Sequence, residues 1–518
     1  MEKSKLKTFL YLGRINNMPI ELVKFPYKYM EYEKILQERE LFALIPDVKI
    51  LSDSKDKTVI SCDLINEDRL KELTYYCSFK INNICCLTRQ GLLEQDDTLR
   101  VTKQHTRYST HGLHEYKGKF NPQIVHAIVN IFNIQHGQTV LDPFNGSGTT
   151  ILECAHAGIE AYGTDINPMA CYIANAKISA LKVDVSKACD VLEELIEKLS
   201  APKWPEIYEE DERLKYLKKW IPSDTLCILE TIRAEMNNKE KTLADLFLIV
   251  ASDLIRDYSY QEPTDLRIRR RKSSFPEISF LDAYNTNIRK YLRKIEIVQS
   301  IENINSFPSN YATNCDIKLN NPFEDLQFDA AITSPPYVTA LPYIDTQRIS
   351  LVWLALCSAS EIGKLDATLI GSRELLKSEK NKWMEIIEQN SKDLPDEIYT
   401  MVVSMSNSLS EKDGFRKQAV PTLVYKYFSE MKEMFINVKT MLKLDARYGL
   451  VVGHNKTTLG EKKYNIDTPQ LLAILAQNCG WSIDEILPLQ TYKRYGLNSK
   501  NAINKESLII LKNTLGGK

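Results

Sequence analysis

The sequence has no run that approaches the roughly 20 consecutive apolar residues a membrane-spanning helix requires. Its first seven residues, Met1 to Lys7, carry several charges and lead into only a short apolar patch, so no secretion signal is predicted. The eleven cysteines include no Cys-x-x-Cys pair and no Cys/His pattern with metal-ligand spacing, which predicts reduced thiols. These absences together predict a cytoplasmic protein.

The chain also has no excess of positive charge. The chain has 67 Lys and Arg against 68 Asp and Glu, a net charge of -1, so the molecule as a whole shows no polycation signature. A surface for nucleic acid would therefore require local segregation of charge. With 518 residues and 43% hydrophobic content, the chain can bury a large core.

From Gly118 onward, helix and strand patterns alternate, which favours a mostly parallel sheet with helices on both faces. Polar motifs follow two of the expected strands, where ligand sites of α/β proteins usually lie. The sequence therefore predicts an α/β fold. The strands expected in the sheet are residues 139–141, 159–164, 311–315, 328–333, 447–453, 483–489 and 507–512.

Two regions fall outside this alternation. Residues 1–110 predict a small N-terminal α+β domain, with strand patterns at 9–12, 48–51, 59–62 and 81–87. Residues 183–310 are charge-rich and mostly helical in pattern, and they are too long for a strand-to-strand connection. We expect them to form an inserted subdomain, with residues 111–182 and 311–518 as the main domain.

The segment Asp142-Pro143-Phe144-Asn145-Gly146-Ser147-Gly148-Thr149-Thr150 ends one strand and begins a helix. Gly146 and Gly148 allow a sharp turn and a close approach to a ligand, and the helix presents unpaired N–H groups to an anion. Asp165 ends the next strand, where a carboxylate can accept hydrogen bonds from ribose hydroxyls. The pattern predicts a nucleotide-like cofactor, and a tight turn without a ligand is the alternative.

A second motif, Thr333-Ser334-Pro335-Pro336-Tyr337, follows the strand at 328–333. The consecutive prolines fix the backbone and remove two N–H donors, so mainly acceptors remain. The Ser334 hydroxyl and the Pro335 carbonyl can both accept from an exocyclic amine, and Tyr337 offers a face for base stacking, worth about 1–3 kcal/mol. The motif predicts a clamp for an amine, with a rigid turn as the structural alternative.

Both motifs resemble those of the DNA amino-methyltransferases, and the Ser-Pro-Pro-Tyr form is most similar to the cytosine-N4 branch. The resemblance covers about residues 111–182 and 311–512. It implies a Rossmann-like seven-stranded methyltransferase sheet, S-adenosylmethionine as cofactor and direct methyl transfer. It implies catalytic roles for Ser334, Pro335, Pro336 and Tyr337. It implies cofactor contacts for Lys119, Phe120, Asp142, Pro143, Phe144, Gly146, Gly148, Thr149, Asp165, Ile166 and Asp316.

The order of the motifs also resembles one group of this family. The cofactor motifs precede residues 183–310 and the catalytic loop follows them, as in the group whose target-recognition region lies between. The resemblance implies double-stranded DNA as partner, with the target base flipped out of the duplex. A role in restriction and modification would add a cognate restriction endonuclease that acts on the same site.

A basic run within residues 183–310 is the best candidate for contacts with DNA. It comprises Arg267, Arg269, Arg270, Arg271 and Lys272. These charges would neutralise phosphates and make binding strongly salt-dependent. A solvated face held by salt bridges is the alternative.

Six of the seven histidines lie between His105 and His156. No carboxylate or cysteine joins them at ligand spacing, so we expect structural roles for the histidines and no metal.

Two other substrates remain open. Methylation of adenine at N6 would use the same chemistry, and the shape of the pocket decides which base is bound. The tRNA guanine-N2 methyltransferases also combine a small α+β domain with a Gly-loop and Pro-Pro-Tyr core. They usually carry Asp where Ser334 stands and lack a long insertion before the catalytic loop.

Overall fold

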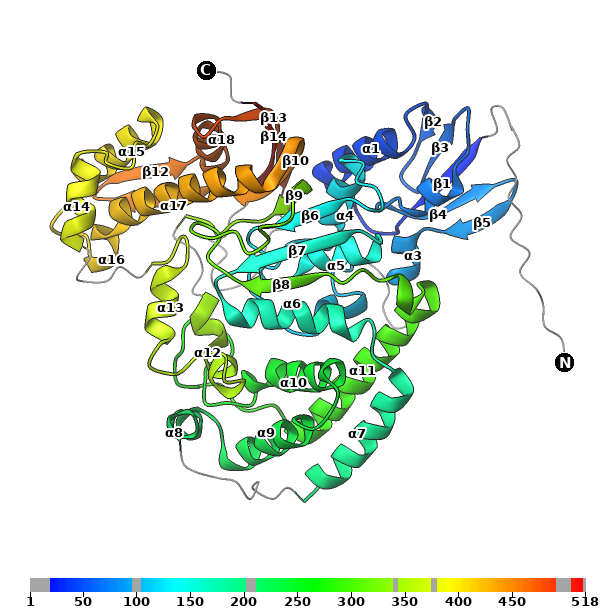
Figure 1. Ribbon diagram of the computed structural model, residues 1–518, viewed down its shortest axis with the longest axis horizontal. Helices are drawn as coiled ribbons and strands as arrows, with labels where there is room; N and C mark the ends of the chain where they lie inside the picture. Colours follow the sequence, from blue (N-terminus) through cyan, green and yellow to red (C-terminus); the bar gives the residue numbers. More distant parts are fainter. Residues whose placement is uncertain are drawn as a thin grey trace. The chain divides into compact units, whose positions relative to one another are not determined.

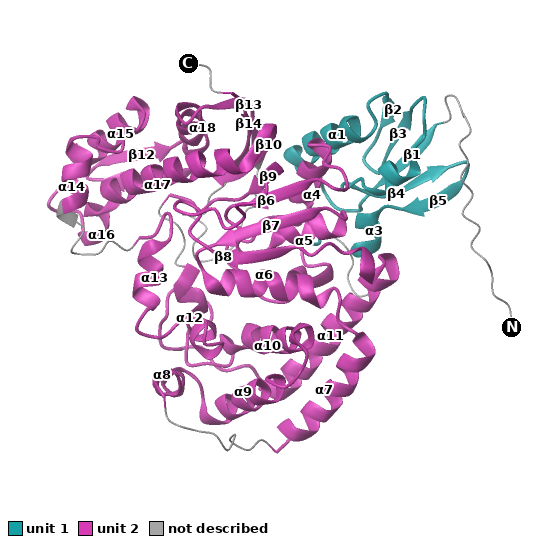
Figure 2. Cartoon of the chain, in the orientation of Figure 1, with its two compact units in different colours: residues 1–105 teal, residues 106–518 magenta. Residues whose placement is uncertain are grey.

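A computed structural model describes residues 19–95, 104–201, 211–338, 343–373, 380–490 and 505–515. The chain divides into two compact units, Met1–His105 and Thr106–Lys518, which Figure 2 shows in different colours. The strand expected at residues 9–12 lies outside the described residues.

The described part of unit 1 contains a five-stranded sheet in the order β2-β3-β1-β4-β5, with every neighbouring pair antiparallel. The strand pattern at 81–87 is interrupted, because Asn82 and Asn83 adopt left-handed backbone angles and form a tight turn between β4 and β5. The strands are β1 (Ile20–Lys24), β2 (Lys49–Asp53), β3 (Lys57–Ser61), β4 (Tyr76–Ile81) and β5 (Ile84–Leu87). The helices are α1 (Glu31–Leu44), α2 (Glu67–Lys71) and α3 (Arg89–Leu93).

Among the described residues of unit 2, the main sheet has seven strands in the order β13-β14-β10-β9-β6-β7-β8 (Figure 1). The pairs among β10, β9, β6, β7 and β8 are parallel, whereas β14 is antiparallel to both β10 and β13. The prediction of a mostly parallel α/β sheet is therefore confirmed. The strands are β6 (Thr139–Asp142), β7 (Glu160–Asp165), β8 (Tyr311–Asn314), β9 (Phe328–Thr333), β10 (Leu442–Gly453), β13 (Trp481–Gln490) and β14 (Lys505–Asn513).

Helices cover both faces of this sheet, as two neighbouring residues of β10 illustrate. The Tyr448 hydroxyl lies 3.6 Å from Sδ of Met434 in α17. On the opposite face, a Cβ at Gly449 would lie 3.3 Å from Phe132, directly after α4. Alternation along the strand thus sends successive side chains to different helical layers. The flanking helices are α4 (Pro122–Ile131), α5 (Thr149–His156), α6 (Pro168–Ala180), α17 (Val420–Met441) and α18 (Thr468–Asn478).

The region between α6 and β8 is helical, and its buried apolar residues share one core with α6 and α12. Asn167 and Asp184 cap α6 and α7 by accepting from backbone N–H groups, which explains where these helices begin. The elements here are α7 (Val185–Leu199), α8 (Glu212–Trp220), α9 (Ser223–Met236), α10 (Lys241–Ile255), α11 (Phe280–Ile301) and the short 3-10 helix η2 (Ile304–Ser306). A further 3-10 helix, η1 (Ser109–Gly112), precedes α4.

A second group of helices separates β9 from α17, and a two-stranded sheet follows β10. The helices are α12 (Tyr343–Trp353), α13 (Ile362–Thr368), α14 (Lys380–Glu388), α15 (Asp396–Asn407) and α16 (Phe415–Gln418), and the strands are β11 (Asn455–Leu459) and β12 (Lys462–Ile466). Within the described residues, no helix combines the length and apolar character needed to cross a membrane.

Candidate cofactor and catalytic site

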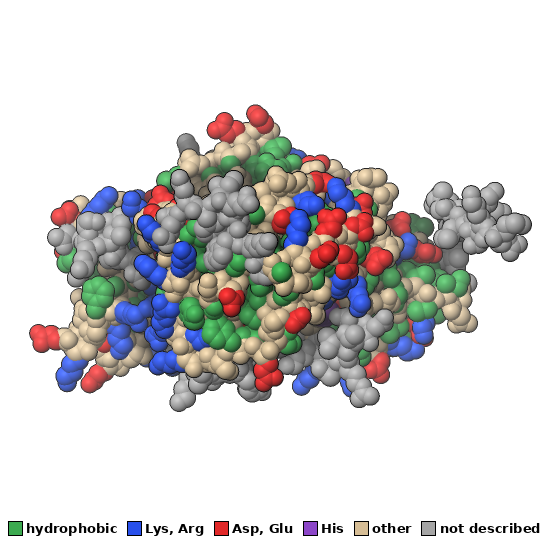
Figure 3. All heavy atoms as spheres, turned by 90° about the horizontal axis from the view of Figure 1, so that it is seen from below, with side chains coloured by type: hydrophobic (Ala, Val, Ile, Leu, Met, Phe, Trp, Pro, Cys, Tyr) green, Lys and Arg blue, Asp and Glu red, His purple; other side chains and the backbone are tan. Residues whose placement is uncertain are grey.

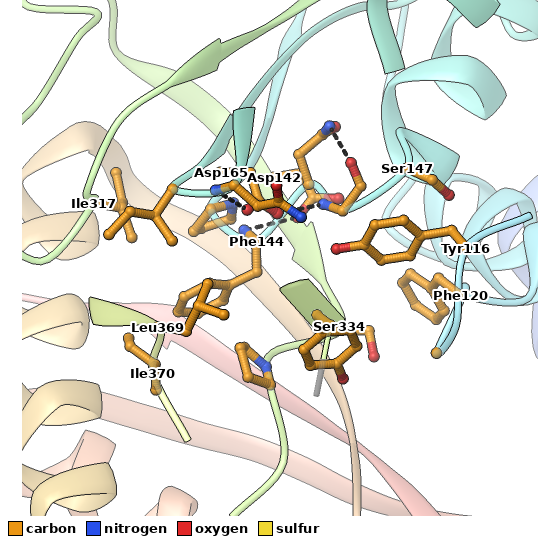
Figure 4. A pocket seen from close by; sticks show the side chains of 18 of the residues that line it. Tyr116, Phe120, Asp142, Phe144, Ser147, Asp165, Ile317, Ser334, Leu369 and Ile370 are labelled. Carbon is orange, nitrogen blue, oxygen red and sulfur yellow. Dashed lines mark hydrogen bonds between the residues drawn. The ribbon is translucent and has the colours of Figure 1, made fainter. Parts of the chain in front are cut away.

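A cavity opens at the carboxyl ends of β6, β7, β8 and β9, in unit 2. It encloses about 880 Å³, open space at its mouth included. Figure 4 shows Tyr116 and Phe120 on one side and Ile317, Leu369 and Ile370 on the other. The predicted cofactor residues that line it are Lys119, Phe120, Asp142, Pro143, Phe144, Gly146, Thr149, Asp165, Ile166 and Asp316.

The two glycines of the glycine-rich loop have different roles. Gly146 lines the cavity, and a Cβ there would lie 3.4 Å from the ring of Tyr116. Gly148, with φ of 80°, is not among the lining residues, and a Cβ there would lie 2.7 Å from that of Ala174 in α6. Gly148 thus permits α5 and α6 to pack closely. The buried Lys177 ammonium donates to the Ser147 carbonyl at 2.8 Å and ties the same helix to the loop.

The carboxylate of Asp165 is held by the loop that it faces. It accepts from the backbone N–H groups of Gly146 at 2.9 Å and Asn167 at 2.8 Å. Burial raises the pKa of Asp165 to about 6 in spite of these hydrogen bonds, which favour the ionised form. An acceptor group therefore lies at the cavity wall, in the position expected for a contact with ribose.

Asp142 joins the cofactor loop to the strand that carries the catalytic loop. Its Oδ1 accepts from the Thr333 hydroxyl at 2.5 Å and from the Phe144 N–H at 3.1 Å. Burial raises the pKa of Asp142 to about 6. Because Thr333 directly precedes Ser334, this hydrogen bond fixes the relative position of the two predicted motifs.

Only two residues of the predicted catalytic loop line the cavity. Ser334 and Pro336 line the cavity, whereas Pro335 and Tyr337 are not among its lining residues. The Tyr337 hydroxyl instead donates to Oε1 of Glu506 in β14 at 2.8 Å. Sequence reasoning did not single out Glu506, because 168 residues separate it from Tyr337 along the chain.

Several further residues line the cavity beside the predicted cofactor and catalytic residues. The rings of Tyr116 and Tyr343 stack at a centroid distance of 6.1 Å, and both line the cavity. Leu369 and Ile370 follow directly after α13 and complete the wall. Tyr116 lies within His114–Pro122, a segment whose sequence is similar to the one that covers the methionine end of the cofactor in the DNA amino-methyltransferases.

The lining residues fit S-adenosylmethionine. The N-terminus of α5 can receive a carboxylate, and two acidic side chains, Asp165 and Asp316, can accept from hydroxyl or amino groups. The Ser147 hydroxyl oxygen lies in this wall, buried and without a hydrogen-bond partner among the described residues. Phe120 and Phe144 supply apolar surface. The cavity thus offers charged, polar and apolar contacts to one ligand.

The histidine-rich segment contains a carboxylate that the sequence analysis missed. Oxygens of the buried Glu153 lie 2.6 Å from Nε2 of His111 and 3.0 Å from Nδ1 of His126, and Tyr108 donates to Glu153 at 2.8 Å. The expectation that no carboxylate joins the histidines was wrong, because packing between helices brings Glu153 to them. Burial lowers the pKa of His111 to about 3. No group of three potential ligands for a metal occurs among the described side chains.

The basic run follows α10, none of its residues lines the cavity, and most of its charges interact locally. Arg269 lies 3.1 Å from Asp265, and Arg270 stacks over Trp220 at 4.7 Å from the ring centroid. Arg271 stacks over Phe275 at 4.4 Å and donates to the Asp257 carbonyl at 2.8 Å. Lys272 is exposed.

Comparisons with known proteins agree with this cavity. Residues 31–176 match a family model described as DNA methylase, and residues 112–258 match one described as RMKL-like, methyltransferase domain. Type II methyltransferase M.MvaI of Kocuria varians is 27% identical over 310 residues, which cover 54% of this chain and 65% of the relative. Type II methyltransferase M.BsoBI of Geobacillus stearothermophilus is 25% identical over 346 residues, which cover 57% of this chain and 66% of the relative. The chain thus spans slightly less than two thirds of each relative.

Among solved structures, TrmN from Thermus thermophilus aligns with 95% of this chain and 99% of its own, at 10% identity and a TM-score of 0.31, too low to add to the assignment. The sequence matches and the cavity together indicate an S-adenosylmethionine-dependent methyltransferase. Within that class they support the DNA amino-methyltransferase family that the motifs resemble. They do not separate the cytosine-N4 branch from the adenine-N6 branch.

Proposed function

We propose that this protein is a site-specific DNA methyltransferase that modifies the exocyclic N4 amine of a flipped cytosine. The observation that carries the proposal is the position of Ser334, which lines the same cavity as the predicted cofactor residues Gly146 and Asp165. The Type II relatives support DNA as substrate and a place in a restriction-modification system. We propose double-stranded DNA as the form that is bound and a cognate restriction endonuclease as the partner.

The residues of the catalytic loop would orient the amine. The Ser334 hydroxyl and the Pro335 carbonyl would accept its two N–H groups, so that the nitrogen lone pair turns toward the cofactor cavity. Bound S-adenosylmethionine would supply an electrophilic methyl group for direct transfer. Positioning and charge stabilisation are then the main contributions of the protein. In this proposal Tyr337 would stack on the flipped base, which repays part of the few kcal/mol that flipping costs.

We assign target recognition to the helical region 183–310. Its length exceeds what a strand-to-strand crossover needs, and it shares a core with α6 and α12 rather than with the sheet alone. A region packed in this way can present a surface next to the catalytic loop without disturbing the strands.

Nucleoside analysis tests the proposal. The protein is incubated with labelled S-adenosylmethionine and either duplex DNA or tRNA, and the product is digested for mass spectrometry. We expect N4-methylcytosine from duplex DNA. N6-methyladenine would correct the base, whereas label found only in tRNA as N2-methylguanosine would refute the proposal.

Ser334→Ala tests the role of the loop. Loss of one hydrogen bond that forms as the amine nitrogen becomes charged should lower turnover about tenfold to a hundredfold. Affinity for S-adenosylhomocysteine, measured by calorimetry, should remain nearly unchanged. Loss of that affinity instead would show that Ser334 serves the cofactor rather than the amine.

A further inference from the structure

Three arginines from distant segments form a group, here called the arginine cluster: Arg267, Arg373 and Arg416. Arg267 follows α10, Arg373 follows α13, and Arg416 lies in α16. Arg373 and Arg416 are exposed, and Arg267 is partly exposed. Partial burial and then the charges of Arg267 and Arg416 lower the pKa of Arg373, as expected when like charges lie close together.

Two members of the cluster lack a neutralising partner. Neither Arg267 nor Arg416 forms an ion pair with a carboxylate of the described residues. The nearest acid in sequence, Asp265, is already engaged, because one oxygen accepts from the Arg267 backbone N–H at 3.0 Å and the other lies 3.1 Å from Nε of Arg269. An anionic partner would neutralise the charges of Arg267 and Arg416, which no carboxylate of the described residues offsets.

The cluster lies beside the candidate catalytic site. Leu369 and Ile370 line the cavity, and Arg373 follows Ile370 by three residues, a reach of at most about 10 Å of chain. Ile268, next to Arg267, packs against the core that contains Leu369. Arg373 is therefore close along the chain to the cavity wall, and Arg267 belongs to the helical region 183–310.

The surrounding surface is also basic. Lys and Arg side chains gather in Figure 3 on the side of unit 2 where α8, α13 and α16 lie in Figure 1. Helix α8 contributes the exposed Lys215, Lys218 and Lys219. The net charge of the chain is only -1, so this surface is a local segregation of charge.

We propose that the arginine cluster binds the phosphate backbone of duplex DNA beside the catalytic cavity. The inference rests on the proposed function and makes it more specific. It also redistributes the roles within the basic run, because Arg267 acts on DNA whereas Arg269 to Arg271 maintain the loop.

The salt dependence of DNA binding tests the cluster. Fluorescence anisotropy with a duplex oligonucleotide gives the dissociation constant over a range of salt concentrations. Each of Arg267→Ala, Arg373→Ala and Arg416→Ala should reduce the slope of log affinity against log salt by about 0.9, the value for one phosphate contact. Lysine at the same positions should preserve the slope.

Arg269→Ala is the matched control, because it removes the same charge from the same loop but from an arginine already paired with Asp265. We expect a clearly smaller change of slope for this variant than for Arg267→Ala. Equal changes would overturn the proposal, as would unchanged slopes in all three cluster variants. Affinity for S-adenosylhomocysteine should persist in every variant, and its loss in Arg267→Ala or Arg416→Ala would also count against the proposal.

Different results would refute the cluster proposal and the proposed function. If the wild-type protein methylates duplex DNA while the cluster variants bind it with unchanged slopes, the cluster proposal alone is refuted. If the wild-type protein methylates only tRNA, the proposed function fails before the variants are compared.

Discussion

At the scale of single residues, Asp165 links cofactor binding to pH. Its pKa is raised to about 6 by burial, so the carboxylate is ionised above that pH and protonated below it. Protonation replaces an acceptor oxygen by a hydroxyl, so affinity for S-adenosylhomocysteine should fall as pH falls through about 6. Calorimetric titration across this range measures the effect.

Asp165→Asn supplies the comparison for this prediction. The amide does not titrate, so the variant should bind more weakly at neutral pH and lack the step near pH 6. The pKa of Asp142 is raised to a similar value, with the charge of Asp165 among the causes. A step that persists unchanged in Asp165→Asn would therefore assign the titration to Asp142.

Glu506 is a second residue whose role can be measured. Its hydrogen bond holds the Tyr337 hydroxyl, so we expect Glu506 to position the ring that is proposed to stack on the base. Glu506→Ala should lower kcat/KM by about tenfold or more, since a hydrogen bond to a charged group contributes about 1.5–3 kcal/mol. Glu506→Gln keeps an acceptor and should retain most activity.

A double-mutant cycle with Tyr337→Phe distinguishes positioning from a general structural effect. Both single changes remove the same hydrogen bond, so the double variant should be little worse than either one. Strictly additive losses would mean that Glu506 acts through other contacts.

At the scale of elements, the contact between α5 and α6 depends on Gly148. Alanine at this position would adopt an unfavourable left-handed conformation and would place its Cβ 2.7 Å from that of Ala174. Backbone strain of about 1–2 kcal/mol and overpacking of about 1–3 kcal/mol should lower the free energy of unfolding. Urea denaturation measures the loss, and cofactor affinity should fall with it because the loop must shift.

Gly137→Ala is the matched control for this prediction. Gly137 has a similar φ of 84°, but a Cβ there would meet no atom within 4 Å. This variant should lose only the strain of about 1–2 kcal/mol. Equal losses at the two positions would show that backbone strain, and not helix packing, explains the need for Gly148. Adding Ala174→Gly to Gly148→Ala should recover part of the packing component, because the Cα of residue 174 would still lie 2.9 Å from the new Cβ.

At the scale of the whole molecule, the distribution of charge matters more than its sum. The chain is nearly neutral, yet charges of distant segments act on one another, because Arg267 and Arg416 help to lower the pKa of Arg373. The buried network of Glu153, His111 and His126 shows the opposite case, since here packing brings complementary polar groups together inside unit 2. Neither arrangement can be recognised from the spacing of its residues in the sequence.

The sequence by itself determined where the strands and helices of the main sheet follow one another along the chain, the two motif loops and the class of cofactor. These features depend on local chemistry: alternation of apolar residues, glycine at left-handed positions and prolines that fix a loop. The tertiary structure decided which segments meet. The contacts of Tyr337 with Glu506 and of Gly148 with Ala174, and the place of Leu369 and Ile370 in the cavity wall, depend on packing between distant elements. Such contacts have no local preference in the chain, because they form only when the helices and strands are assembled around a common core.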